Sequence, residues 1–296
     1  KQHVWWKRNR DNYKKNKILL CLLLIYSFSF SQGNLLKELE SESENKKSNE
    51  ISAFKAIKIV NTQSTKQASE KELYLYVSHR FGSVNGGIKT LFGLDIANTK
   101  IELLYGLSEN LQIGFSRESL KKTYALNAKY NITTQSSKLP FTSSLYASYN
   151  YNSSLDEDIY PNLSSSDRSL FFGQLLLSKS FSDKISLQLS PSFARKGFAE
   201  TIFEQENNFI LGVASSYRIT NRLAFNIEYS ANLDRPEISP FNDVLSFGID
   251  IETGGHVFQL LFSNTQTIDD VSVMTDAEGS WKDGEIYFGF NILRVF

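Results

Sequence analysis

Residues 73–296 alternate apolar and polar positions with a period of two over many successive segments. This period places alternate side chains on opposite faces of a β-strand. In each segment one face is apolar and the other is small or polar. The pattern predicts about twelve strands, near residues 72–81, 100–107, 111–117, 121–132, 141–151, 169–181, 185–194, 207–219, 223–232, 244–252, 256–263 and 284–296.

Two features favour a membrane barrel over a soluble β-sandwich, which alternates in the same way. Most segments are about ten residues long, as tilted strands crossing a bilayer require, whereas sandwich strands are usually nearer five or six. Tyr and Phe also recur at strand ends on the apolar face, as in an interfacial girdle. The predicted fold class is therefore all-β, an up-and-down antiparallel transmembrane β-barrel that is apolar outside and polar inside.

The joins between the segments alternate in length. Three tight joins share one pattern, with an apolar residue, Ser or Thr, two polar residues and an apolar residue, at 107–111, 181–185 and 219–223, and a fourth lies at 253–255. The longer joins lie between them, at 82–99, 152–168, 195–206, 233–243 and 264–283, with a short exception at 118–120. Short turns at one end and long loops at the other are typical of outer-membrane barrels. An even number of strands puts both chain ends on the short-turn, periplasmic side.

The first part of the chain has a different composition. A basic stretch, an apolar run at 18–26 and small residues at Ser29 and Ser31 predict a secretory signal peptide over residues 1–31. The only cysteine, Cys21, falls in that signal, so the mature chain has no thiol chemistry. Residues 32–71 are predicted to be a polar periplasmic segment, in which the more apolar stretch 51–60 is a candidate plug element. The barrel is then residues 72–296.

One stretch carries a family resemblance. It contains SHRFG at 78–82, NGG at 85–87, LFGLD at 91–95, LYGL at 104–107, GFSR at 114–117 and KTY at 122–124. Over residues 78–130 the chain resembles an uncharacterised family of β-barrel proteins of Bacteroidetes-type bacteria, a domain of unknown function. The resemblance implies an outer-membrane location and supplies no activity, ligand or catalytic residue.

Catalytic chemistry has little support in the sequence. Only His79 and His256 remain after the signal, and the strand pattern puts them near opposite ends of the barrel. Ser78 adjoins His79, but neighbouring strand residues point to opposite faces, so they cannot form a dyad. We therefore expect no enzyme, no catalytic residue, no metal and no cofactor. Residues 1–31 hold seven Lys or Arg and one Asp in a neutral chain, so the remainder is mildly acidic and has no footprint for nucleic acid.

Charges elsewhere fall into two groups. The loop carboxylates Asp156, Glu157 and Asp158, and a second set at 269–285, lack the calcium-loop pattern, and we expect them to be solvated or in weak contact with divalent cations and lipopolysaccharide. A few ionisable residues fall on the inward face of the strands. These lumen-lining candidates, which either line water or form salt bridges, are Glu102, Lys129, Arg218, Glu228 and Asp250.

Loop 82–99 is unusually apolar, with Ile88, Leu91, Phe92 and Leu94. The sequence leaves three outcomes open: an inward constriction, a short helix, or a docking surface for a partner. The chain ends on Phe296 with apolar residues on the same face, which resembles the signal read by the outer-membrane assembly machinery, although Arg294 interrupts the row.

The sequence predicts an integral protein of the outer membrane in contact with lipid and lipopolysaccharide. Two functions remain: a narrow pore or passive transporter for small polar solutes, or a non-conducting structural or partner-binding component of an envelope complex. The protein partner in the second case is unknown.

Overall fold

In the computed structural model, residues 53–136 and 138–296 are described. The predicted signal peptide and most of the polar segment after it lie outside these residues. The described part contains twelve strands. They are β1 Leu73–Ser83, β2 Ala97–Ser108, β3 Leu111–Glu118, β4 Thr123–Thr133, β5 Thr142–Asn152, β6 Ser169–Ser180, β7 Ile185–Lys196, β8 Asn207–Arg218, β9 Leu223–Asn232, β10 Val244–Thr253, β11 His256–Ser263 and β12 Tyr287–Val295.

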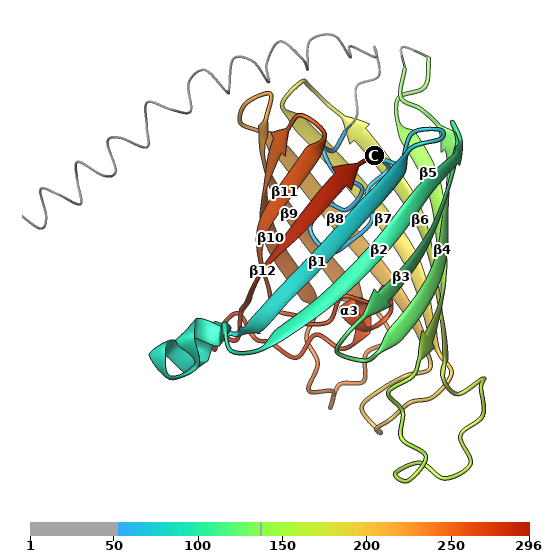
Figure 1. The fold of residues 1–296 in the computed structure, drawn as a ribbon, viewed down its shortest axis with the longest axis vertical. Helices are drawn as coiled ribbons and strands as arrows, with labels where there is room; N and C mark the ends of the chain where they lie inside the picture. Colours follow the sequence, from blue (N-terminus) through green and yellow to red (C-terminus); the bar gives the residue numbers. More distant parts are fainter. Residues whose placement is uncertain (1–52, 137) are drawn as a thin grey trace, which may run out of the picture. The chain divides into compact units, whose positions relative to one another are not determined.

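The strands close into a single barrel in which each pairs antiparallel with its neighbours in sequence and β12 pairs with β1 (Figure 1). At the closing seam Tyr74 lies opposite Val295 and Arg80 lies opposite Gly289. Closure leaves no unpaired sheet edge, which a hydrocarbon environment would penalise. The predicted fold class and the predicted number of strands are confirmed, and the strand bounds agree to within three residues.

The two ends of the barrel differ. At one end, which we call the turn end, the joins are short, with 134–141 between β4 and β5 the longest. At the other, the loop end, lie the long joins, including 153–168 and 264–286 (bottom of Figure 1). The loop between β1 and β2 forms the 3₁₀ helix η1, Val84–Gly93. Ile88 in it is 82% exposed, so of the three outcomes left open this segment takes the short helix and not an inward constriction.

The outer wall is an apolar surface. Leu, Ile and Tyr side chains on the odd-numbered side of β2 are exposed, whereas Asn98, Lys100, Glu102 and Leu104 on the other side are buried. The same two-residue alternation runs through β7 and β8. Exposed apolar side chains all round a barrel are suited to lipid contact. No helix within the described ranges is long and apolar enough to span a membrane.

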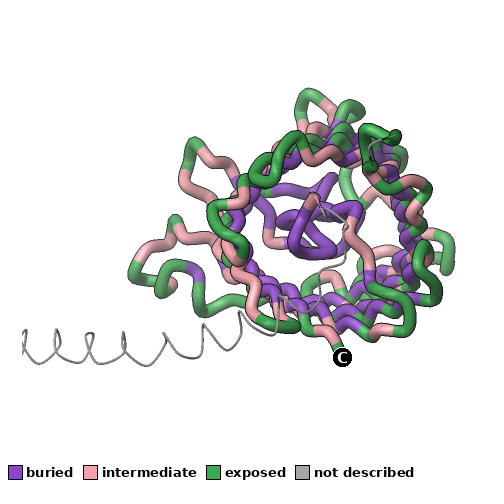
Figure 2. The backbone as a smooth tube through the Cα atoms, turned by 90° about the horizontal axis from the view of Figure 1, so that it is seen from above, coloured by how far each residue is buried: buried purple, intermediate pink, exposed green. Residues whose placement is uncertain are grey.

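The interior of the barrel is filled by chain. Residues 54–65 are almost all buried and lie inside the ring of strands, as the tube inside the barrel shows (Figure 2). From the loop end, residues 264–277 also enter and carry the short helix α3, Ser272–Thr275 (Figure 1). Of the candidate plug at 51–60, residues 54–60 are buried inside the barrel, and we call residues 54–65 the first plug and residues 264–277 the second. The second plug was not expected from the sequence.

Residues 66–72 lead from the first plug to β1, and this stem lies against Gly106. The backbones of Glu70 and Gly106 form a parallel bridge, and Lys71 donates to the Gly106 carbonyl at 2.8 Å. A methyl group on Gly106 would lie 1.9 Å from the Ser69 carbonyl oxygen, so only glycine permits this approach.

We expect Gly106→Ala to weaken the seating of the stem, because backbone has to move to admit the methyl group. Such overpacking costs about 1–3 kcal/mol. The measurement is the temperature at which the folded, fast-migrating band in unboiled SDS gels converts to the unfolded one. Gly173→Ala is the control, since nothing lies within 4 Å of its added methyl group. Equal shifts in the two variants would contradict the close approach.

Candidate functional site: a lumen filled from both ends

The first plug contains a β-hairpin at residues 57–64. The Ile59 amide donates to the Thr62 carbonyl and the Ser64 amide to the Ile57 carbonyl, both at 2.8 Å. These ladder bonds satisfy only a few of the hairpin's backbone groups. The other groups are buried away from water, where each needs a partner.

Charged side chains of the wall supply many of those partners. The Glu228 carboxylate accepts from the amides of Val60, Asn61 and Thr62 at 2.8–3.2 Å, and from the Thr62 hydroxyl at 2.8 Å. The Lys129 ammonium donates to three plug carbonyls, at 57, 64 and 66, at 2.9–3.3 Å. Hydrogen bonds to charged groups contribute about 1.5–3 kcal/mol each. Glu228 thus binds the turn of the hairpin, and Lys129 binds the opposite, open end.

Side-chain amides of the wall supply further partners. Gln259 donates to the carbonyls of Lys58 and Ile59, Asn291 to that of Val60, and Gln188 to that of Gln63. On β3, the Gln112 side chain accepts from the Ala68 amide at 2.7 Å. The amides act as partners of the plug backbone in place of adjacent strands.

Apolar contacts and ion pairs add to these bonds. Ala56 and Ile57 pack with Tyr76, Leu104 and Leu293, while Phe54, Ile59 and Val60 pack with Ala214 and Leu261. Two plug lysines pair with wall carboxylates at 2.6 Å, Lys58 with Glu102 and Lys55 with Glu252. The first of these pairs is almost completely buried.

The second plug is the segment 264–277 from the loop between β11 and β12. Val271, Val273 and Met274 pack against the wall residues Tyr146, Leu170, Phe172, Leu176, Ala194 and Ile210. Polar contacts fix its entry: the Ile268 amide donates to Glu118 at 2.9 Å, and Tyr146 donates its hydroxyl to Asp270 at 2.7 Å. The Asp269 carboxylate caps the start of α3 by accepting from the backbone amide of Ser272.

Asp276 fastens this segment to the rim. Its carboxylate accepts from Lys121, in the join between β3 and β4, and from Lys196 at the end of β7. Burial by itself raises the pKa of Asp276, but the two ammonium groups outweigh burial and hold that pKa well below its usual range. The pKa of Lys121 is raised in turn, because the charge of Asp276 opposes the effect of burial.

The structure places four of the five lumen-lining candidates in the interior. Glu102, Lys129, Glu228 and Asp250 are at most 2% exposed, and the first three contact the hairpin plug directly. Arg218 has the inward register but is the last residue of β8 at the turn end, and is only partly buried. The sequence left two roles open for these residues, lining water or forming salt bridges. Glu102 forms a salt bridge in a filled lumen.

The expectation that inward-facing charges are few was an undercount. Four further strand residues are buried and inward-facing: Arg80, Lys100, Glu118 and Lys196. Their inward register could have been read from the period of two. The last three were not expected because they lie at or beyond the ends of the strands that the sequence predicts.

The two acidic clusters lie in different environments, one exposed and the other largely buried. Asp156, Glu157 and Asp158 are exposed, which confirms solvation. For the second cluster solvation was wrong: Asp269, Asp270 and Asp276 are no more than 5% exposed, because the loop that carries them turns into the barrel. Their local sequence resembles that of a solvated loop, and the lysines that bind them are distant in the chain.

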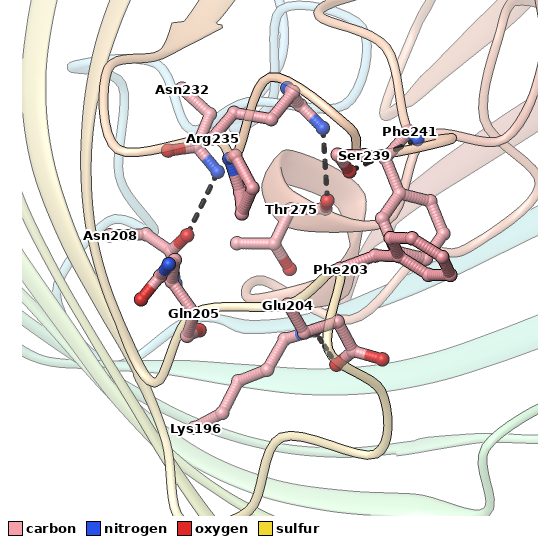
Figure 3. Close-up of a pocket in the computed structure, with 11 residues that line it drawn as sticks. Lys196, Phe203, Glu204, Gln205, Asn208, Asn232, Arg235, Ser239, Phe241 and Thr275 are labelled. Carbon is pink, nitrogen blue, oxygen red and sulfur yellow. Dashed lines mark hydrogen bonds and ion pairs between the residues drawn. The ribbon is translucent and has the colours of Figure 1, made fainter.

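The remaining candidates form no reactive cluster. The His79 ring stacks on Phe290 on the outer face, and His256 lies at the turn-end start of β11. Within the described ranges no group of three or more His, Cys, Asp or Glu side chains is placed to hold a metal ion. A pocket at the loop end, beside Lys196, Glu204, Arg235 and Thr275, has a volume of only about 10 Å³ (Figure 3). That is room for about one water molecule.

A closed antiparallel barrel with an apolar outer wall and a polar inner wall defines the class of membrane-bound β-barrels. The chain belongs to the family DUF5777, the membrane bound beta barrel domain, whose model matches residues 54–296. The part of the expectation from residues 78–130 that concerns a β-barrel family of unknown function is thereby confirmed, and the match includes the hairpin plug. No curated protein matches the chain.

Solved structures with a similar fold include outer-membrane porins and channels. The NanC porin is 9% identical, with 75% of this chain and 98% of that chain covered at a TM-score of 0.45. The KdgM porin in complex with disordered oligogalacturonate is 10% identical, covering 76% and 99% at 0.46. The COG4313 outer membrane channel from Pseudomonas putida F1 is 11% identical, covering 78% and 97% at 0.46.

We expect Asp276→Asn to release the loop plug, because it leaves Lys121 and Lys196 without their shared counter-charge. Breaking a buried ion pair costs about 3–5 kcal/mol, and this case falls at the lower end since Lys196 keeps Glu204 at 2.6 Å. Release is measured by maleimide labelling of Ser272→Cys, a buried position, in a Cys21→Ser background.

The labelling also has a defined pH dependence. A depressed carboxyl pKa stabilises the docked loop fully above the ordinary value of 3.8 and is lost only as pH falls below it. The ratio of the labelling rate of Asp276→Asn to that of the parent should therefore stay constant from about pH 5 to about pH 8, because Asp276 remains ionised over that range. Glu278→Gln, which alters an exposed carboxylate of the same loop, is the control. Equal labelling of the two variants would contradict the role of Asp276.

Proposed function

We propose that this protein is a gated passive channel for small polar solutes, closed in the present conformation by its two plugs. The observation that carries the proposal is the chemistry of the plug contacts. The wall binds the hairpin largely through side chains of Glu, Lys, Gln and Asn, whose hydrogen bonds water can replace once the plug leaves.

The polar inner wall gives further support to the channel. Ser, Asn, Gln and Gly line β7, β8 and β9 on their inward faces. Twelve strands lie between the eight whose interior is filled by side chains and the sixteen or more of wide aqueous channels. The alternative, a non-conducting structural or partner-binding component, has its support in the present filling of the lumen.

We further propose that the barrel lies in the outer membrane, with the turn end and both chain ends in the periplasm. Short turns at one end and long loops at the other support this orientation. Lipid and lipopolysaccharide would contact the apolar wall. The terminal Phe296, which is 61% exposed, would be read by the assembly machinery. No catalytic role is part of the proposal.

Orientation can be tested by labelling intact cells with a membrane-impermeant maleimide. In a Cys21→Ser background, Glu157→Cys at the loop end should react and Asp183→Cys at the turn end should not. Both native side chains are exposed, so reactivity reports the side of the membrane and not burial. Labelling at 183 but not at 157 would reverse the orientation.

Conduction can be tested in planar bilayers. We expect the parent to have little conductance, deletion of residues 33–66 to raise it, and that deletion combined with Asp276→Asn to raise it further. The order follows from the structure, because the loop plug still occupies the loop end after the hairpin is removed. A full-length counterpart, Glu228→Gln with Asp276→Asn, loosens both plugs without a deletion.

Two controls make the result decisive. Glu278→Gln should leave the conductance at the parent level. Each variant should also keep the faster migration of the unboiled protein, which shows that the barrel is closed. A doubly opened barrel that inserts correctly yet conducts nothing would overturn the channel and favour the structural or partner-binding alternative.

A further inference from the structure

The two plugs carry opposite charges. The described hairpin segment brings Lys55, Lys58 and Lys66 into the barrel and no carboxylate before Glu70, whereas the loop segment 264–277 brings three aspartates and no basic residue. Wall carboxylates pair with Lys55 and Lys58 of the hairpin, and lysines of the wall and rim pair with Asp270 and Asp276 of the loop. Exceptions are Lys129, which binds hairpin carbonyls, and Glu118, which binds a loop amide.

The two plugs meet at a pair of wall residues. Lys100 and Glu102 lie on the same inward face of β2, with the Lys100 ammonium 3.8 Å from the Glu102 carboxylate. On one side of this pair Lys58 of the hairpin lies 2.6 Å from Glu102. On the other side Asp270 of the loop lies 3.8 Å from Lys100. The result is a buried chain of four alternating charges, of which only the middle two belong to the wall.

Lys100 is the unusual member of this chain. Its side chain is 2% exposed, yet its ammonium has no hydrogen-bond partner among the described residues, and both neighbouring carboxylates stay at 3.8 Å. A buried ammonium without a hydrogen bond is costly. The neighbourhood offers further polar groups: the Tyr146 hydroxyl donates to Asp270, and the Asn127 amide contacts Glu102 at 3.4 Å. This corner of the wall can therefore bind a carboxylate more closely than Asp270 does.

We propose that Lys100 and Glu102 form the solute site of the opened lumen, and that it takes zwitterions carrying an ammonium and a carboxylate on one carbon atom, as α-amino acids do. The inference rests on the proposed channel function. In the opened barrel the solute's carboxylate takes the place of Asp270 and contacts Lys100 and Tyr146, while its ammonium takes the place of Lys58 and contacts Glu102. The plug groups are internal stand-ins for the two ends of the solute.

Glycine and its uncharged isomer glycolamide provide a matched pair of probes, since they have the same atoms and size. Permeation is measured by swelling of liposomes that contain the full-length Glu228→Gln and Asp276→Asn variant, with the 33–66 deletion carrying Asp276→Asn as a second opened form. We expect glycine to permeate about two- to fivefold faster than glycolamide, the factor that water-exposed ion pairs provide.

Variants of the pair identify the cause of that preference. Adding Lys100→Gln with Glu102→Gln should equalise the two rates. The exchanged pair, Lys100→Glu with Glu102→Lys, should keep the preference for glycine, because a zwitterion can bind in the reverse direction. Unboiled gel migration confirms that each barrel is folded.

Every other outcome decides against the site. Equal permeation of the two isomers in the opened barrels would overturn the zwitterion site and leave the channel standing. A glycine preference that survives the double Gln variant would place selectivity elsewhere on the wall. If neither isomer permeates either opened form, the proposed channel fails and the site fails with it.

Discussion

The interior of this barrel is governed by one requirement, which is that buried polar groups have hydrogen-bonding partners. Closing a sheet of twelve strands satisfies the strand backbones, but it leaves a lumen lined with polar side chains. A chain segment that enters this lumen brings its own backbone groups, which cannot reach water. Glu228, Lys129 and Gln259 satisfy them, and the plug in turn satisfies these wall residues. Wall and plug thus depend on each other.

Charge follows from the same requirement. A buried ion is tolerated when an opposite charge accompanies it. The hairpin brings only lysines to its described buried part and meets Glu102 and Glu252, whereas the loop brings aspartates and meets Lys121 and Lys196. Removing either plug therefore exposes an uncompensated charge on the wall. Water then has to solvate this charge, or a solute has to neutralise it. This link between filling and charge makes the plugs relevant to what the lumen would bind.

The contacts also differ in how readily they are exchanged. When a plug leaves, water can take the place of each lost side-chain hydrogen bond or ion pair, whereas nothing replaces the apolar burial that the clusters around Ile57 and Val273 lose. The apolar clusters therefore oppose opening, and the polar network lowers its cost. At the rim, Asp276 adds an ionic contact between strands that are far apart in the chain.

The sequence by itself determined the membrane barrel, its strand bounds and the two kinds of join. It did so because alternation of side chains is a local property of a strand, and the lipid-facing half of it is apolar throughout in β9. It also identified Glu102, Lys129, Glu228 and Asp250 as inward-facing, since register follows from the same period.

Only the tertiary structure decided what those residues contact. Whether the stretch before β1 and the last long loop lie inside or outside the barrel depends on partners such as Lys121, 155 residues away from Asp276. A run of aspartates has the same sequence in solvent as in a buried ion pair, so solvation was the wrong expectation for Asp269, Asp270 and Asp276. The period of two specifies which face of a strand is polar, and closure of the barrel specifies what fills the space that this face encloses.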